Sequence, residues 1–223
     1  MIRKMRYIAV LTLFCCMLPA AFADSQKIYS EGRNEVHGGN IIVTQSGQID
    51  AYDGSTVCAY NNAKVNAYDN CTVDAHDYSE VHAAAQVKVK GQDNCQIFAT
   101  DQSSVEASGN ATIYGKNSVT IVARGNTTLF VQGNVKVKCY GNSSVNASGN
   151  ARVEAYDTST VRARQDSTVI ACDSASVKAY DSSVVTAMKG VEVICADKAK
   201  VTYIDSPEAA KTPGAANPTE INQ

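Results

Sequence analysis

The side chains of this sequence that are best suited to metal or nucleophilic chemistry are its histidines and cysteines. The histidines are His37, His76 and His82. Asp74, His76 and His82 could approach one another at one end of the molecule, but a zinc site needs three or four ligands in a fixed geometry. The simpler interpretation is that the histidines are scattered over the surface, so we predict no metal site.

Three aromatic side chains, Phe98, Tyr114 and Phe130, follow one another at intervals of 16 residues. The polar residues two positions earlier are Gln96, Thr112 and Thr128. Exposed aromatic side chains grouped in this way can bind a glycan or a partner protein. The alternative is a stack of rings that only stabilises a sheet. Either interpretation requires an element that brings residues 16 apart into one column.

A repeat of eight residues supplies that element. In steps of eight from Ile41 to Val201, all 21 positions are Val, Ile or Leu, without an insertion. The residues two before and two after each of them are mainly small, whereas the residues between them vary among charged, polar and aromatic types. This alternation has the period of a strand with one buried face. Abundant β-branched valine also favours strands.

A turn is expected once in every repeat, at the position of Asp53. Asp, Asn and Gly dominate the equivalent positions, and all three tolerate a left-handed backbone. They do not share a charge, because neighbours such as Asp101 and Gly109 alternate a carboxylate with glycine. Glycine has no side-chain ligand for a hard cation, and the period is eight rather than the nine of calcium-binding repeats. These aspartates therefore predict turns rather than calcium sites.

One repeat cannot be stable alone. Burying one Val gains roughly 1.5–3 kcal/mol, while ordering eight backbone residues costs about 1–2 kcal/mol each. Stability must come from stacked coils that share hydrogen bonds and a core. We therefore predict an all-β fold, a single parallel β-solenoid with two octads (16 residues) per coil and about ten coils spaced about 4.8 Å apart. Three octads per coil is the alternative, but a wider coil needs bulkier core residues.

Cysteines other than Cys15 and Cys16 of the N-terminal segment number six. Cys71, Cys95, Cys139 and Cys195 lie at inward positions that Ala or Ser fills in other repeats, so we expect small core residues there. Cys58 and Cys172 are expected to face outward, about seven coils apart and too far from each other to form a disulfide. An oxidising compartment would permit disulfides, but these positions favour free thiols.

The N-terminus has the features of a secretory signal peptide over residues 1–23. Arg3, Lys4 and Arg6 precede an apolar run over residues 7–18, and Ala-Phe-Ala at 21–23 supplies a cleavage site. An uncleaved anchor is the alternative, but the apolar run is shorter than the roughly 20 residues that span a bilayer. We therefore expect export to the periplasm, the cell surface or the medium, with no membrane insertion after cleavage.

The remaining chain divides into three parts. Residues 24–40 are expected to be an N-terminal cap or leader, residues 41–206 the repeat domain, and residues 207–223, which contain three prolines, a disordered tail. Without the signal peptide the chain keeps 17 basic and 22 acidic residues, a net charge of about −5. This charge does not favour binding to nucleic acid or to an anionic membrane.

The octad AYDGSTVC at residues 51–58 resembles the octapeptide AGYGSTLT of bacterial ice-nucleation proteins, and AYDTSTVR at 155–162 resembles it less closely. The resemblance implies a β-solenoid with a 16-residue coil. In that family, two outward threonines flank each inward aliphatic residue and form the ice-matching array. Here no octad has both; for example, Thr56 is matched by Cys58 and Thr112 by Tyr114. Ice nucleation is therefore not implied, and weak ice binding is kept as an alternative.

No serine, cysteine or carboxylate pair stands out as catalytic, and an uninterrupted repeat array has no long loops to build a cleft. We therefore predict a secreted, non-enzymatic structural or surface-interaction protein, adhesin-like or scaffold-like, without a cofactor. The candidate binding residues are Phe98, Tyr114 and Phe130 with Thr112 and Thr128. The alternatives are head-to-tail self-assembly into filaments, because a solenoid end presents unpaired backbone groups, and weak ice binding.

Overall fold

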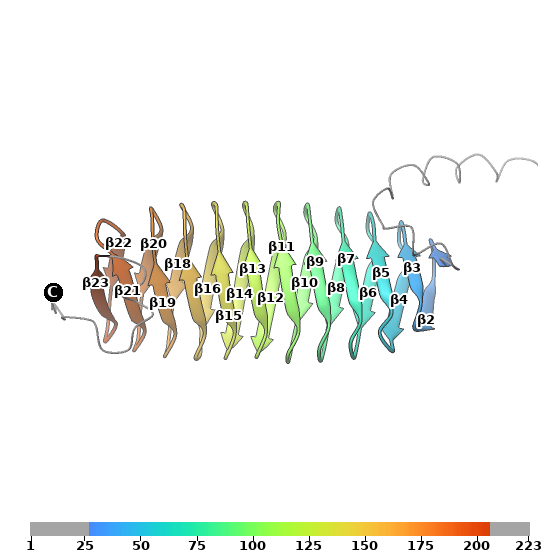
Figure 1. Cartoon of the computed structure of the whole chain (residues 1–223), viewed down its shortest axis with the longest axis horizontal. Helices are drawn as coiled ribbons and strands as arrows, with labels where there is room; N and C mark the ends of the chain where they lie inside the picture. Colours follow the sequence, from blue (N-terminus) through green and yellow to red (C-terminus); the bar gives the residue numbers. More distant parts are fainter. Residues whose placement is uncertain (1–26, 206–223) are drawn as a thin grey trace, which may run out of the picture.

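The computed structural model describes residues 27–205, which form a parallel β-solenoid of about 11 coils. The strands follow one another along a straight rod (Figure 1). Odd-numbered strands form one 12-stranded sheet, the odd sheet, and even-numbered strands form an 11-stranded sheet, the even sheet. The predicted fold class, with two octads per coil, is confirmed, with one coil more than the ten expected.

The strands of the odd sheet are β1 (Lys27–Tyr29), β3 (Asn40–Val43), β5 (Thr56–Ala59), β7 (Thr72–Ala75), β9 (Lys88–Gly91), β11 (Ser104–Ala107), β13 (Thr120–Ala123), β15 (Lys136–Cys139), β17 (Arg152–Ala155), β19 (Thr168–Ala171), β21 (Val184–Met188) and β23 (Lys200–Ile204). Those of the even sheet are β2 (Arg33–His37), β4 (Gln48–Tyr52), β6 (Lys64–Ala67), β8 (Glu80–Ala83), β10 (Gln96–Ala99), β12 (Thr112–Asn117), β14 (Thr128–Gly133), β16 (Ser144–Ser148), β18 (Thr160–Ala163), β20 (Ser176–Ala179) and β22 (Glu192–Cys195).

The core lies between the two sheets. The predicted aliphatic positions from Ile41 to Val185 are buried, whereas Val193 and Val201 in the last coil are only partly buried. Buried serines that precede the strands close the turns: Ser159 Oγ donates to Tyr156 O at 2.6 Å and Ser183 Oγ to Tyr180 O at 2.7 Å. These two hydroxyls are satisfied inside the core, whereas Ser79 Oγ has no hydrogen-bond partner. The small inward residues therefore fill the core, and the serines among them also hold the turns through hydrogen bonds.

Two glycines replace the usual inward alanine, and each faces a larger aliphatic residue. A Cβ at Gly91 would lie 2.5 Å from Ile97 Cδ1, and one at Gly115 would lie 2.9 Å from Ile121 Cδ1. Isoleucine is longer than the usual valine, so its terminal methyl fills the space that the missing Cβ leaves. Core volume is thus balanced between neighbouring positions, as close packing requires.

The predicted turn position is confirmed. Residues with positive φ recur at intervals of eight, as in Asp53 (φ 55), Asn61 (φ 58) and Asp69 (φ 57). Several of the aspartates also link successive coils: Asp77 Oδ2 accepts a hydrogen bond from Asn61 N at 2.9 Å, and Asp157 Oδ2 one from Gly141 N at 2.8 Å. Aspartate at this position therefore tolerates the left-handed backbone and also caps an amide one coil away.

The N-terminal segment continues the solenoid. Within residues 24–40, where we expected a cap or leader, β1 and β2 form a first coil that pairs with the next through Lys27 to Ile41 and Arg33 to Gln48. These offsets of 14 and 15 residues are shorter than the repeat. The signal peptide predicted over 1–23 and the tail predicted over 207–223 lie outside the described residues.

Candidate functional site

The predicted aromatic column forms a continuous ring stack on the even sheet. The centroids of His82 and Phe98 are 4.6 Å apart, those of Phe98 and Tyr114 are 4.8 Å apart, and those of Tyr114 and Phe130 are 5.2 Å apart. The rings are within 12° of parallel. These separations match the spacing of hydrogen-bonded strands. We call these four residues the ring ladder.

Stacking determines which ring surfaces a ligand can reach. Phe98 and Tyr114 each have a ring on both sides, so their faces are covered and only their edges point outward. At the last ring the situation differs, because the register partner of Phe130 on β16 is Asn146. Phe130 is 42% exposed. The interior of the ladder therefore stabilises the sheet, and the one ring with a face open toward the next coil is Phe130.

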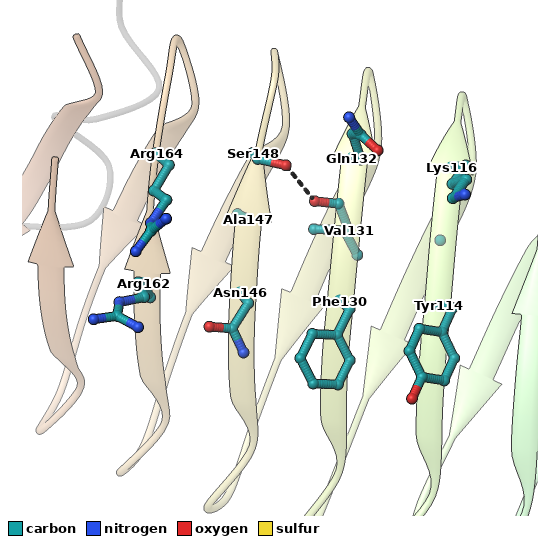
Figure 2. Close-up of a pocket in the computed structure, with 11 residues that line it drawn as sticks. Tyr114, Lys116, Phe130, Val131, Gln132, Asn146, Ala147, Ser148, Arg162 and Arg164 are labelled. Atoms are coloured by element: carbon teal, nitrogen blue, oxygen red, sulfur yellow. Dashed lines mark hydrogen bonds between the residues drawn. The ribbon is translucent and has the colours of Figure 1, made fainter. Parts of the chain in front are cut away.

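An open groove of about 450 Å³ begins at that face. Its first row follows the ladder column from Tyr114 and Phe130 to Asn146 and then to Arg162 (Figure 2). Asn146 has the shortest side chain in this row. The groove thus arises from a step in side-chain size on a regular backbone, where β16 carries a small residue between two larger ones.

A second row runs parallel to the first, two residues further along each strand. It contains Lys116, Gln132, Ser148 and Arg164, and again the small residue belongs to β16 (Figure 2). β12 and β14 are six residues long, so Lys116 and Gln132 lie within the sheet and pair with each other in register. Ser148 Oγ donates to Val131 O at 3.3 Å. The longer strands extend the flat surface on which the groove lies.

The groove is positively charged. Its lining includes Lys116, Arg162 and Arg164 and no Asp or Glu. Within residues 27–205, none of these three cations takes part in an ion pair. The guanidinium carbons of Arg162 and Arg164 lie 5.4 and 5.6 Å from the centroid of the Tyr180 ring, a cation–π arrangement. The hydrogen bond from Arg162 lowers the pKa of the Tyr180 hydroxyl.

The structure brings only part of the predicted site together. Tyr114 and Phe130 line the groove, whereas Phe98 lies inside the ladder and Thr112 and Thr128 lie on its other side, outside the lining. Sequence reasoning missed six polar or charged lining residues: Lys116, Gln132, Asn146, Ser148, Arg162 and Arg164. The signal for them was present, because these residues continue the 16-residue steps through and beside the aromatic column.

The histidines do not gather into one site. Asp74 and His76 pair at 3.3 Å at the odd sheet, while His82 on the even sheet pairs with Glu80 at 2.8 Å. The interaction with the Asp74 carboxylate raises the pKa of His76 despite partial burial. No group of three or more metal-ligating side chains occurs in the described part of the chain.

Two predictions for the cysteines were wrong in detail. Cys58 and Cys172 were expected to face outward, but they are 8% and 2% exposed. In the register, Cys58 lies between Ile42 and Asp74, and a short side chain between longer neighbours is covered by them. Cys195, expected in the core, is exposed because it belongs to the last coil of the even sheet.

Among residues 27–205, none of the six cysteines forms a disulfide. Burial raises the pKa of Cys95 and of Cys139 to about 11. Since the thiolate is the reactive form of cysteine, these two side chains are core residues rather than nucleophiles.

No family model, curated protein or solved structure matches this chain. Within the described residues there is no helix of the length and hydropathy needed to cross a membrane.

Proposed function

We propose that this chain is an exported, non-enzymatic β-solenoid that binds a glycan in the groove of the even sheet. The observation that carries the proposal is the open face of Phe130 beside a row of hydrogen-bonding side chains. A sugar ring presents C–H groups that pack on an aromatic face and hydroxyl groups that need donors and acceptors. Gln132, Asn146 and Ser148 supply both kinds of group.

The scaffold suits such a role because it holds these groups in a fixed arrangement. Every strand that lines the groove is paired on both sides in register. A rigid surface loses little conformational freedom when it binds a ligand. The lining contains no carboxylate, histidine or cysteine, which favours binding over acid–base or nucleophilic catalysis.

The test is a screen of the purified protein against immobilised neutral and acidic glycans, repeated with Phe130→Ser. Tyr140→Ser is the matched control, because Tyr140 belongs to a ring stack next to the odd sheet, with its centroid 5.0 Å from that of Tyr156. We expect wild type and Tyr140→Ser to retain the same glycans, and Phe130→Ser to bind them roughly tenfold more weakly. Far-UV circular dichroism should show that all three proteins are folded.

Two results would overturn this proposal. One is the absence of binding to any glycan by the wild-type protein. The other is binding that Phe130→Ser leaves unchanged, since the open ring face would then have no part in recognition.

Self-association at the solenoid end is a second candidate. In the last coil Val193 and Val201 are only partly buried and Ile194 is 50% exposed. Within residues 27–205, the terminal strands β22 and β23 also have one edge without a strand partner. Sedimentation velocity over a hundredfold concentration range would decide the matter, because a filament former must grow with concentration, whereas a concentration-independent monomer rules assembly out.

A further inference from the structure

We infer that the glycan bound in this groove is anionic, with a carboxylate or sulfate held by Arg162 and Arg164 and a sugar ring placed above Asn146 against Phe130. This inference rests on the proposed function and specifies its substrate class. Three steps lead to it: the size of the gap above Asn146, the charge around that gap, and the extent of the groove along the rod.

The gap above Asn146 has the dimensions of one missing ring. Phe130, Asn146 and Arg162 are consecutive members of one column, so Phe130 and Arg162 are separated by two strand spacings, about 9.6 Å. Rings within the ladder are 4.6 to 5.2 Å apart. A ring placed above Asn146 would therefore lie about one ladder spacing from Phe130 and about one from Arg162. The ligand continues the stack where the sequence interrupts it.

The charge around this gap favours a negative partner. On β2 and β6 of the even sheet the cations are paired within the fold: Arg33 Nε lies 2.6 Å from Asp50 Oδ2, and Lys64 Nζ lies 3.2 Å from Glu80 Oε2. Around the groove, Arg162 and Arg164 contact the Tyr180 ring instead. A guanidinium group matches a carboxylate or sulfate through two parallel hydrogen bonds. The acidic partner that the paired cations have within the chain is here supplied by the ligand.

The groove also extends along the rod beyond a single sugar. Lys116 and Arg164 are three coils apart in the second row, which corresponds to about 14 Å. A chain that lies along the solenoid axis and carries more than one charge can contact Lys116 and the arginines together. This geometry favours an acidic oligosaccharide or polysaccharide over a monosaccharide.

A single-stranded nucleic acid also combines rings with negative charge, but it fits the surface less well. Proteins that bind it stack successive bases on several aromatic faces, whereas the interior rings of this ladder have both faces covered. An oligonucleotide therefore serves as a competing probe in the test.

The experiment compares matched pairs of polymers by calorimetry: polygalacturonate against its methyl ester, and chondroitin sulfate against desulfated, carboxyl-reduced chondroitin. Each pair keeps the sugar backbone and removes the charge. We expect at least one acidic member to bind more than tenfold more tightly than its neutral form, and its affinity to fall as salt rises from 50 to 500 mM. Arg162→Gln/Arg164→Gln should weaken that binding at least tenfold.

Two further variants keep the test decisive. Lys88→Gln/Lys90→Gln removes the same charge from β9 on the odd sheet and should leave binding unchanged. Asn146→Asp places a carboxylate beside Arg162 without touching the arginines, and it should also weaken binding at least tenfold. The inference is wrong if neutral polymers bind as tightly as acidic ones, or if neither groove variant changes the affinity.

The outcomes separate this inference from the proposed function. Binding of neutral polymers that Phe130→Ser weakens would overturn the anionic ligand and support glycan binding. Binding of a thymidine oligonucleotide, with no polysaccharide bound, would overturn both.

Discussion

Two stretches of the even sheet share one backbone repeat but differ in how their outward polar groups are satisfied. From β2 to β8, Asp50 accepts hydrogen bonds from Arg33 Nε and Asn66 Nδ2, both at 2.6 Å, and Glu80 contacts Lys64 and His82 at 3.2 and 2.8 Å. From β12 to β18 the strands contain no Asp or Glu, and the cations face a groove. We call these the paired stretch and the open stretch.

The difference shows that the backbone repeat does not determine which side chains occupy the outward-facing columns. The inward columns are alike in both stretches, with Val65 and Val81 buried in one and Val145 and Val161 buried in the other. Stability is therefore supplied mainly by residues that the two stretches share. Ion pairs at the surface add little to it, so the open stretch is free to present unpaired cations to a ligand.

The ring ladder joins the two stretches, and the contrast between an interior ring and the end ring gives the largest predicted effect. Phe98→Ala should destabilise the protein by about 2 kcal/mol, because it removes a half-buried ring with neighbours on both faces. Phe130→Ala should cost about 1 kcal/mol, since Phe130 stacks on one face only. Urea unfolding midpoints measure the difference.

Ligand binding should show the reverse order, with Phe130→Ala weakening glycan binding more than Phe98→Ala. The same ranking of the two variants for stability and for binding would contradict the distinction between a structural ladder interior and a functional ladder end.

The fold could be predicted because its determinants are local and repeated. The aliphatic position recurs from Ile41 to Val201, and the turn position near Asp53 is occupied mostly by Asp, Asn or Gly, which accept positive φ. Each repeat predicts the same strand and turn, so one atypical octad does not change the predicted fold. The period of 16 in the aromatic column then predicted the ring stack itself.

The groove could not be predicted in the same way, because it depends on relative side-chain size across neighbouring coils. In the sequence Asn146 looks like any other outward residue; it forms part of a groove because its neighbours in the register, Phe130 and Arg162, are larger. Likewise, Cys58 occupies an outward position and is buried by the residues beside it. Periodicity identifies which way a side chain points; it does not tell what the adjacent coils leave uncovered.

A smaller effect is predicted for the carboxylate at the centre of the paired stretch. Burial acts to raise the pKa of Asp50, but the hydrogen bonds from Arg33 and Asn66 outweigh it and lower the pKa below 3.8. Asp50→Asn should destabilise the protein by about 1 kcal/mol at pH 7, a modest amount because Arg33 is largely exposed.

The pH dependence of Asp50 has a definite sign. Because its folded-state pKa is lowered, its contribution is present above pH 3.8 and is lost as the pH falls through the folded-state value. Unfolding midpoints of wild type and Asp50→Asn should therefore differ at pH 7 and converge as the pH falls through the folded-state pKa of Asp50. Asn146→Ala in the open stretch is the control and should show no such pH dependence; a gap that persists in acid would show that the paired charge is not the cause.

The smallest effect is expected at His37, at the N-terminal end of the paired stretch. Its ring stacks on Tyr52 at 5.1 Å, and its nitrogens lie 2.6 Å from Asp53 and 3.0 Å from Glu35. These contacts, that of Asp53 first, raise the pKa of His37 above 6.5. The pairing therefore stabilises the first coil below pH 6.5 and is lost as the pH rises through the folded-state pKa.

Asp53→Asn should bring the pKa of His37 back toward 6.5, because it removes the strongest partner while Asn still tolerates the positive φ of this turn. Histidine NMR titration measures the shift directly, and His76 is the internal control. The pKa of His76 is raised first by Asp74, so it should not respond to Asp53→Asn. If the pKa of His37 stays raised in the variant, Glu35 rather than Asp53 is its cause, and His37 does not stabilise the contact between the first two coils through Asp53.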